Sequence, residues 1–203
     1  PAVVYRKAQR VLPVSSGDPA VEKAKFEAAL ETAREQLTAL FEKAKVEIGE
    51  EQAAIVEVQL LMLDDLDYLD GVNLAIEGGA AAAIAALDTG EEFAQVFAAM
   101  DDEYMKGRAA DVKDVSARIL GILCGVVQGG IDSDVPVLLA SDDLAPSETI
   151  QLDKTKILGF VTSFGSSSSH TAILARTLGI PSVVGLGDQL DPIYEGRQVV
   201  VDG

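Results

Sequence analysis

The chain has 203 residues, of which 48% are hydrophobic and 24% charged, so it can bury a core and is slightly long for one compact domain. Its net charge of −17 disfavours binding to nucleic acid or to anionic membranes and favours a partner with a positive face. The single cysteine, Cys124, excludes an internal disulfide and fits a cytoplasmic setting. The longest apolar stretch, Ile119–Val127, is far shorter than the ~20 residues of a spanning helix, and we expect no membrane insertion and no signal peptide.

The N-terminal segment Pro1–Pro13 alternates roughly between apolar and polar residues, which predicts one or two strands. Asp18 and Pro19 then form a helix start, because an aspartate caps free amides and proline suits the first helical position. From residue 19 to about 124 the apolar residues follow a helical period. Gly49 is expected to break or kink the first helix, whose apolar face consists of Leu30, Leu37, Leu40, Phe41, Ala44 and Ile48.

Four further features complete the helical region. Apolar residues from Ile55 to Leu69 continue a second amphipathic stretch, and Gly71 with the pair at 78–79 predicts the next turn. The alanine-rich segment 80–87 predicts a helix that Phe93–Phe97 extends. Asp101–Glu103 places acids at a helix start, and the stripe that follows ends at Gly125. We therefore expect an all-α insertion of about four helices.

Beyond residue 130 the sequence becomes rich in β-branched residues. Short runs predict strands at Val135–Ala140, Ile157–Thr162, Ser182–Gly185 and Gln198–Val201, and a helix at about Ser169–Leu178 lies between two of them. Strand, helix and strand at this spacing predict an α/β unit. We expect an α/β domain of residues 1–18 and 125–203, interrupted by a helical domain of residues 19–124.

The segment Gly165–Thr171 carries four serines and the only histidine, His170. It joins a predicted strand to a predicted helix, where backbone amides, the helix dipole and hydroxyls favour an anion. A neutral imidazole at such a site is a plausible nucleophile toward phosphorus, and Arg176 could pair with phosphoryl oxygens. A lone histidine is more often structural, so the residues alone leave both roles open.

The residues also bear on serine hydrolysis and on metal binding. The Gly-x-Ser-x-Gly elbow of serine hydrolases is absent. One histidine and one cysteine argue against a zinc-type site, and we expect no metal site. An all-carboxylate Mg²⁺ site remains open at the cluster Asp64, Asp65, Asp67 and Asp70, although helix surfaces carry such clusters routinely.

A family resemblance narrows these alternatives. Residues 165–185, GSSSSHTAILARTLGIPSVVG, resemble the phosphohistidine signature of the PEP-utilising enzymes. Two further segments, LAPSETIQLDKTKILGFVTSFG at 144–165 and DDEYMKGRAADVKDVSARIL at 101–120, resemble the N-terminal half of enzyme I of the PEP:sugar phosphotransferase system. The resemblance covers nearly the whole chain. It implies a swivelling phosphohistidine α/β domain with a helical insertion.

The resemblance also implies roles for particular residues. His170 matches the histidine that accepts phosphate from PEP on Nε2, and Thr149 matches the threonine whose hydroxyl contacts it. Arg176 matches the arginine of the motif, and Ser168 and Ser169 stand where the family has threonine and serine before the histidine. The implied activity is phosphoryl transfer from PEP through His170 to the carrier protein HPr, the first step of the sugar phosphotransferase system.

The helical insertion resembles the platform on which HPr docks. An acidic face there would steer a basic carrier and speed their encounter. The resemblance implies that Mg²⁺ and PEP bind a C-terminal barrel outside these residues. We therefore expect no cofactor in this chain and no labelling of His170 by PEP alone. We also expect the chain to be a monomer. The residues that match the family's contact face are Glu50, Glu51, Glu57, Gln59, Met62, Asp67 and Arg108.

Three alternatives remain. The chain could be the enzyme I-like part of a dihydroxyacetone kinase phosphotransferase subunit, which would need fused partner domains. It could be the swivelling domain of PEP synthase or pyruvate phosphate dikinase, against which the helical region 19–124 counts. It could also be a non-catalytic acidic adaptor. The sequence does not decide between a sugar and a nitrogen-regulatory branch, or which sugars are transported.

Overall fold

The structure is a computed structural model that describes residues 2–4, 12–126, 135–153, 155–167, 169–187 and 196–202. Backbone contacts divide the chain into two compact units. One consists of Pro1–Ala8 and Gly129–Gly203, and the other of Gln9–Gln128. The sequence placed the two boundaries after residues 18 and 124. The first is ten residues later than the observed boundary after Ala8, and the second is four residues earlier than the observed boundary after Gln128. We refer to these parts as the α/β unit and the helical unit.

The helical unit begins with its longest helix, α1 (Pro19–Ile48). As expected, Asp18 caps this helix: its carboxylate accepts from the amide of Ala20 at 2.9 Å, and Pro19 occupies the first helical position. Gly49 ends it with a φ of 93°, a left-handed value that a side chain would disfavour. The expected apolar face is largely buried, with Leu37 and Ala44 fully so.

Four shorter helices follow: α2 (Glu50–Met62), α3 (Leu66–Glu77), α4 (Ala82–Ala98) and α5 (Glu103–Leu123). The prediction of one stretch from Ile55 to Leu69 was wrong, because the chain turns at Leu63 and Asp65 starts α3 by accepting from the amide of Tyr68 at 3.0 Å. The unit therefore has five described helices rather than about four. Gly71, expected in a turn, lies inside α3.

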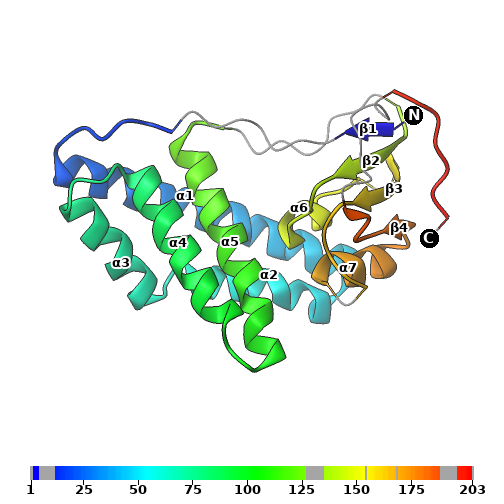
Figure 1. The fold of residues 1–203 in the computed structure, drawn as a ribbon, viewed down its shortest axis with the longest axis horizontal. Coiled ribbons are helices and arrows are strands. Elements are labelled where there is room, and N and C mark those ends of the chain that lie inside the picture. The colour runs from blue at the N-terminus through cyan, green and yellow to red at the C-terminus, as the bar shows by residue number, and fades with distance from the viewer. Residues whose placement is uncertain are drawn as a thin grey trace. The chain divides into compact units, whose positions relative to one another are not determined.

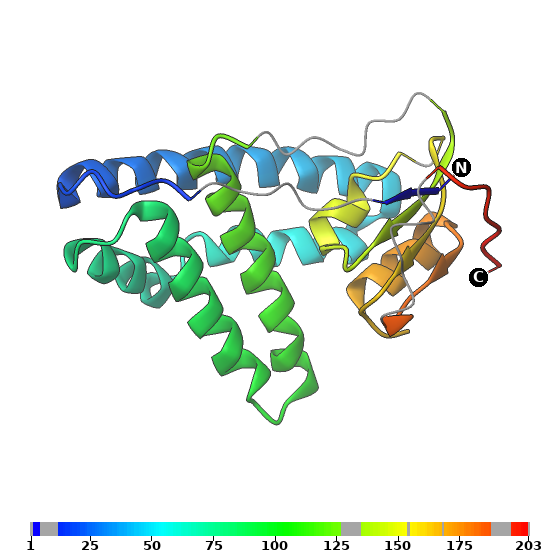
Figure 2. The ribbon, with the colours of Figure 1, turned by 45° about the horizontal axis from the view of Figure 1, so that its top comes forward.

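Helices α4 and α5 make the most extensive helix–helix contact of the unit. They run in opposite directions (Figures 1 and 2) and are joined by a short turn in which Asp102 caps α5, accepting from the amide of Met105 at 3.0 Å. The predicted start and end of α5 are confirmed, with Gly125 just beyond it at φ 67°. The largest fully buried apolar side chains of the unit are Phe26, Leu37, Val56, Leu63, Ile76 and Ile119.

The α/β unit is built on a parallel sheet in the order β1–β2–β3–β4, comprising Ala2–Val4, Val137–Ser141, Ile157–Thr162 and Ser182–Val183. Helix α6 (Pro146–Ile150) follows β2, and α7 (His170–Leu178) follows β3. The expected strands at 135–140 and 157–162 and the helix at 169–178 are confirmed. The fully buried Leu139, Phe160 and Leu174 form its core.

Two expectations for this unit need correction. Residues 198–201 are not a strand; the preceding residues bond to β1 instead, since the amide of Ala2 donates to the carbonyl of Arg197 at 2.8 Å. Strand β4 ends at Val183 rather than at residue 185. The expectation of one or two strands in Pro1–Pro13 is met by Ala2–Val4, and residues 5–11 lie outside the described part. Among the described helices, none is both long and apolar enough to cross a membrane.

Candidate phosphohistidine site and docking face

His170 is the first residue of α7 and follows the loop that leaves β3. Ser169 is the N-cap: its hydroxyl oxygen accepts from the amide of Ala172 at 3.3 Å and its hydroxyl donates to the carbonyl of Ser166 at 2.8 Å. The first amides of a helix have no partner within it and carry the positive end of its dipole. His170 therefore begins a helix at a place that favours a bound anion. Ser168 and the ring of His170 lie outside the described part of the chain.

The loop before α7 is anchored at the carboxyl edge of the sheet. The amide of Ser163 donates to the carbonyl of Ser141 at 3.1 Å, and that of Phe164 to the carbonyl of Asp142 at 2.9 Å. On the other side, the amides of Leu186 and Gly187 donate to the carbonyls of Thr162 and Ser163 at 3.1 and 2.8 Å. These bonds tie together the loops that follow β2, β3 and β4. Ligands of open parallel sheets bind at this edge.

Two glycines allow these loops to approach each other. Gly165 has a φ of 103° and Gly185 a φ of 77°, a region that other residues rarely adopt. A Cβ atom on Gly185 would lie 2.9 Å from the carbonyl oxygen of Gly165, closer than atoms pack. Sequence reasoning placed Gly185 only at the end of a strand, because a single glycine does not reveal what lies opposite it.

Arg176 lies on the exposed side of α7, and its guanidinium donates to the backbone carbonyl of Ser167 at 2.7 Å. The arginine thus closes the serine-rich loop onto the helix that His170 begins. A guanidinium has five donors, so this bond leaves capacity for an anion. The structure accordingly brings Arg176 to the loop of Ser169.

The short helix α6 packs against α7 and was not predicted from the sequence. Thr149, on α6, is fully buried, and its hydroxyl donates to the carbonyl of Ala145 at 3.1 Å. Thr171, the residue after His170, donates to the carbonyl of Leu144 at 2.7 Å. This second bond fixes the first turn of α7 to the segment before α6. Sequence reasoning missed the role of Thr171. It also missed α6, for which Pro146 at the first helical position is a signal.

Most residues of the expected docking face are accessible. Glu50, Glu51 and Glu57 are exposed on α2, Asp67 is exposed at the start of α3, and Met62 is half-buried at the end of α2. Arg108, on α5, is half-buried, with its guanidinium 4.7 Å from the centre of the Tyr104 ring and bonded to the Tyr104 hydroxyl. We call these six residues the docking face.

Gln59 differs from the other residues of the expected contact set. Its side chain is only 1% exposed, and its amide nitrogen donates to the carboxylate of Asp114 on α5 at 2.8 Å. It follows Glu57 by two positions, which places it on nearly the opposite side of a helix with 3.6 residues per turn. Gln59 therefore contributes to the packing of α2 on α5 and presents no surface to a partner.

The acidic cluster that suggested a magnesium site is dispersed in the structure. Asp64 pairs with Arg34, whose guanidinium donates to both carboxylate oxygens at 2.7 and 3.1 Å, and this pairing lowers the pKa of Asp64. Asp65 caps α3. Within the described residues, no group of three or more His, Cys, Asp or Glu side chains is placed to hold a metal ion.

Comparisons with known protein families agree with this geometry. The family model described as PEP-utilising enzyme, N-terminal, matches residues 1–108, and that described as PEP-utilising enzyme, mobile domain, matches residues 134–203. The phosphoenolpyruvate-protein phosphotransferase of Staphylococcus aureus is 37% identical over the whole chain, and that of Bacillus sp. (strain S) is 42% identical over 92% of it. The chain spans 35% and 32% of these relatives, about a third of their length.

Two solved structures are also similar. A solution structure of an enzyme I protein has a TM-score of 0.73 and 38% identity, covering 92% of this chain and 77% of its own. The N-terminal domain of a protein titled Enzyme 1 - Nitrogen has a TM-score of 0.66 and 27% identity, covering 91% and 77%. The chain belongs to the PEP-utilising enzymes, a family of phosphoryl-transferring proteins. Within that family it is an N-terminal region of the enzyme I type.

Proposed function

We propose that this chain is the phosphohistidine-bearing part of a phosphoenolpyruvate-protein phosphotransferase, and that His170 carries a phosphoryl group from PEP to HPr. The position of His170 at the start of α7, directly after the N-cap Ser169, is the observation that carries the proposal. In the first half-reaction a bond forms between an imidazole nitrogen of His170 and phosphorus while the bond from phosphorus to the enol oxygen of PEP breaks. In the second half-reaction the bond between His170 and phosphorus breaks while phosphorus bonds to the acceptor group of HPr. Phosphoryl transfer mainly requires positioning and charge stabilisation.

The chain's own residues would meet both requirements. The helix start and Ser169 favour the negative phosphoryl group, and Arg176 would share its donors between the Ser167 carbonyl and the phosphoryl oxygens. Thr149 would support the ring: its hydroxyl donates to Ala145 and retains acceptor capacity. Thr171 would hold the first turn of α7 in place through Leu144.

We assign carrier docking to the helical unit. The docking face presents four exposed carboxylates and one cation, Arg108, which suits a carrier with a basic surface, because complementary charges steer diffusional encounter. We expect two domains that move separately. Residues 1–18 and 125–203 form the α/β domain, which carries His170, and residues 19–124 form the helical domain, which carries the docking face. Since donor and acceptor differ, the α/β domain would move between them.

PEP itself would bind outside these residues. The family resemblance assigns PEP and Mg²⁺ to a C-terminal barrel, and the relatives are about three times as long as this chain. When bound there, Mg²⁺ would stabilise the charge on the phosphate of PEP. We therefore expect the chain to exchange phosphate with phosphorylated HPr and to take none from PEP and Mg²⁺ alone.

The decisive experiment mixes the chain with phosphorylated HPr and maps the modified residue by intact mass and peptide sequencing. We expect one phosphoryl group on His170, labile in acid and stable in alkali, unlike phosphate on Ser166 or Ser167. His170→Ala should fold normally, bind HPr and accept no phosphate. Ser167→Ala is a matched control, because its exposed hydroxyl is next to the site while its carbonyl is the group that Arg176 uses.

An acidic adaptor without catalysis predicts a different pattern. Binding of HPr with no transfer to wild-type protein would favour that reading, as would a His170→Ala variant with unchanged function. Phosphate on a serine would refute the assignment of His170. Strong labelling by PEP and Mg²⁺ alone would contradict the assignment of the PEP site to residues beyond this chain.

A further inference from the structure

Two exposed apolar side chains lie beside the start of α7 and have no role in the chemistry proposed above. Phe164, in the loop that leaves β3, is 61% exposed, and Ile173, on α7, is 40% exposed. Single exposed apolar residues are common on protein surfaces. These two differ from such residues because both lie close to Ser169, the N-cap of the helix that His170 begins. We call Phe164 and Ile173 the apolar rim.

The backbone of Phe164 is held on both sides. Its amide donates to the carbonyl of Asp142 at 2.9 Å, and its carbonyl accepts from the hydroxyl of Thr162 at 2.6 Å. The next residue, Gly165, lies against the N-cap, because a Cβ atom there would be 3.7 Å from the Oγ atom of Ser169. The loop therefore presents an aromatic ring to solvent from a fixed position, and a contact made by this ring costs little ordering entropy.

Ile173 belongs to the exposed side of α7. The residues before and after it, Ala172 and Leu174, are buried, and its amide donates to the carbonyl of Ser169 at 3.0 Å. Residues three positions apart on a helix are neighbours on its surface, so position 170 lies one turn before Ile173. The two members of the apolar rim thus border the start of α7, one from the loop and one from the helix.

Any protein that exchanges phosphate with His170 must cover this surface. Transfer requires the phosphorus of the donor and the accepting nitrogen to approach within about 3–3.5 Å. A carrier at that distance buries the residues around the first turn of α7, which include the apolar rim. Burial of the rim also expels water from the site, and this strengthens the attraction between the phosphoryl oxygens and the guanidinium of Arg176.

We propose that the apolar rim is a contact surface for HPr in the complex through which the phosphoryl group passes, and that HPr meets it with apolar side chains beside its own phosphoryl-bearing group. The inference rests on the proposed function, because it requires HPr to reach His170. It adds a contact of a different kind to the docking face. The docking face is mainly acidic and steers the carrier, whereas the apolar rim closes the site around the transferring group.

The test measures transfer from phosphorylated HPr to the 203-residue chain by rapid quench, as an apparent second-order rate constant. Phe164→Ser should lower this constant by about tenfold, the effect expected when roughly half of an exposed aromatic ring is buried in a contact. Ile173→Ser, which removes a smaller exposed area, should lower it by about threefold. Leu158→Ser is the matched control and should transfer like wild type. Leu158 is 55% exposed on β3, near the end of the strand away from the loop of Phe164.

Phosphoramidate provides a second measurement that needs no protein partner. In this reaction an imidazole nitrogen of His170 bonds to phosphorus, the bond between phosphorus and nitrogen in phosphoramidate breaks, and that nitrogen leaves as ammonia. A donor this small makes no use of the apolar rim, so wild type, Phe164→Ser and Ile173→Ser should be labelled at equal rates. Thermal unfolding checks that the variants fold, and its midpoint should not change because both side chains are exposed.

The outcomes separate the inference from its premise. If Phe164→Ser and Ile173→Ser accept phosphate from HPr as fast as wild type, or if Leu158→Ser is slowed equally, the rim contact is refuted while the proposed function stands. A parallel loss of labelling by phosphoramidate would also refute it, because the two residues would then act on His170 itself. If phosphoramidate labels His170 but HPr transfers nothing to wild-type protein, the assignment of HPr as partner and the inference both fail.

Discussion

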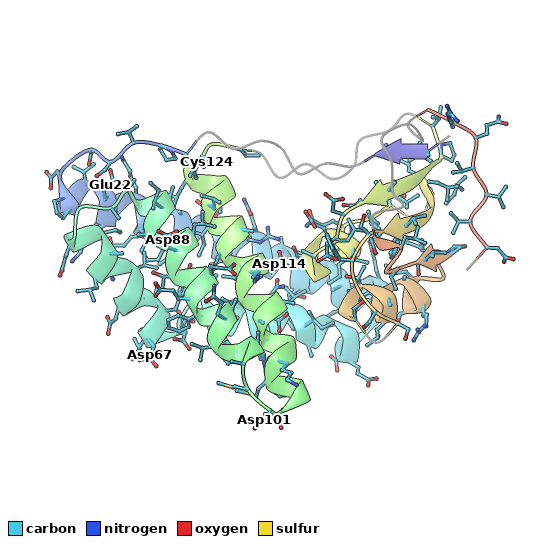
Figure 3. The ribbon with its side chains drawn as sticks, in the orientation of Figure 1. Glu22, Asp67, Asp88, Asp101, Asp114 and Cys124 are labelled. Atoms are coloured by element: carbon cyan, nitrogen blue, oxygen red, sulfur yellow. The ribbon has the colours of Figure 1, made fainter. Side chains whose placement is uncertain are left out.

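The carboxylate of Glu22 accepts a hydrogen bond from the backbone amide of Ala82 at 2.8 Å. Glu22 lies in the first turn of α1, and Ala82 begins α4, sixty residues later (Figure 3). Ala81, at the N-cap position of α4, has no side-chain oxygen to offer. The buried Glu22 therefore caps a distant helix, and it also accepts from the amide of Ser16 at 2.9 Å and from Lys25 at 2.7 Å.

We predict that Glu22→Gln destabilises the helical unit by about 1–2 kcal/mol at pH 7, because a charged acceptor of three donors becomes a neutral amide. Hydrogen bonds lower the pKa of Glu22 from 4.5 to about 2. The bond from the amide of Ala82 has the largest effect, and the bond from Lys25 has the next largest. The stabilisation is therefore complete above pH 4.5 and is lost as pH falls toward 2. Urea unfolding between pH 3 and 7, followed by circular dichroism, measures this.

Glu27→Gln is the control, since Glu27 is exposed on the same helix and loses the same charge. Its unfolding free energy should stay within about 0.5 kcal/mol of wild type. Equal losses for the two variants would show that net charge, and not the cap on α4, accounts for the effect of Glu22.

Much of the helical unit could be predicted because its signals are local. Asp18, Pro19 and Gly49 fix the ends of α1 through capping and backbone conformation, and each is legible in a few residues. The break before α3 was missed because Leu66 and Leu69 continue the apolar period of α2. Only the bond from Asp65 to the amide of Tyr68 shows that the chain turns there, and an aspartate within an acidic run gives little sign of it.

The candidate site was only partly predictable for a similar reason. The serine loop and His170 form a local pattern that indicates a helix start. Gly185 and Thr171 act through partners distant in sequence, the carbonyls of Gly165 and Leu144. Gln59 was assigned to the surface by resemblance, whereas its bond to Asp114 depends on how α2 packs against α5.

Asp111→Asn should stabilise the helical unit at neutral pH, independently of any partner. The folded-state pKa of Asp111 is raised to about 7 from 3.8, chiefly by burial, so folding becomes less favourable as pH rises from 3.8 to 7 and the penalty is complete above that range. The gain should be on the order of 2 kcal/mol at pH 8 and should vanish near pH 4. Urea unfolding at both pH values measures it.

Asp114→Asn provides the contrast, because Asp114 already accepts a hydrogen bond from Gln59. Loss of its charge should weaken that bond and destabilise the unit at pH 8. A destabilised Asp111→Asn variant at pH 8 would mean that its carboxylate is well solvated or paired in solution.

Thr171→Val should slow phosphoryl transfer and destabilise the α/β unit by about 1–2 kcal/mol, because the carbonyl of Leu144 loses a buried donor. The first turn of α7 would then be less firmly held where His170 begins it. Thr177→Val is matched, since Thr177 is exposed on the same helix and donates to Ile173 within it. Single-turnover transfer from phosphorylated HPr should fall for the first variant and stay near wild type for the second.

Gly185→Ala should disrupt the loop before α7 and reduce transfer to His170. Its φ of 77° costs about 1–2 kcal/mol for a residue with a side chain, and its new Cβ would meet the carbonyl oxygen of Gly165 at 2.9 Å. Relieving that contact shifts the loop that ends at Ser169, at an added cost of about 1–3 kcal/mol.

Gly187→Ala isolates the first effect, the conformational cost of a positive φ. Gly187 has a φ of 62°, and a Cβ there would meet no atom within 4 Å, so this variant should carry the conformational cost alone and keep most of its transfer rate. Thermal unfolding and single-turnover transfer, measured on both variants, separate backbone strain from displacement of the loop. Equal transfer rates for Gly185→Ala and Gly187→Ala would mean that the contact between residues 165 and 185 does not position His170.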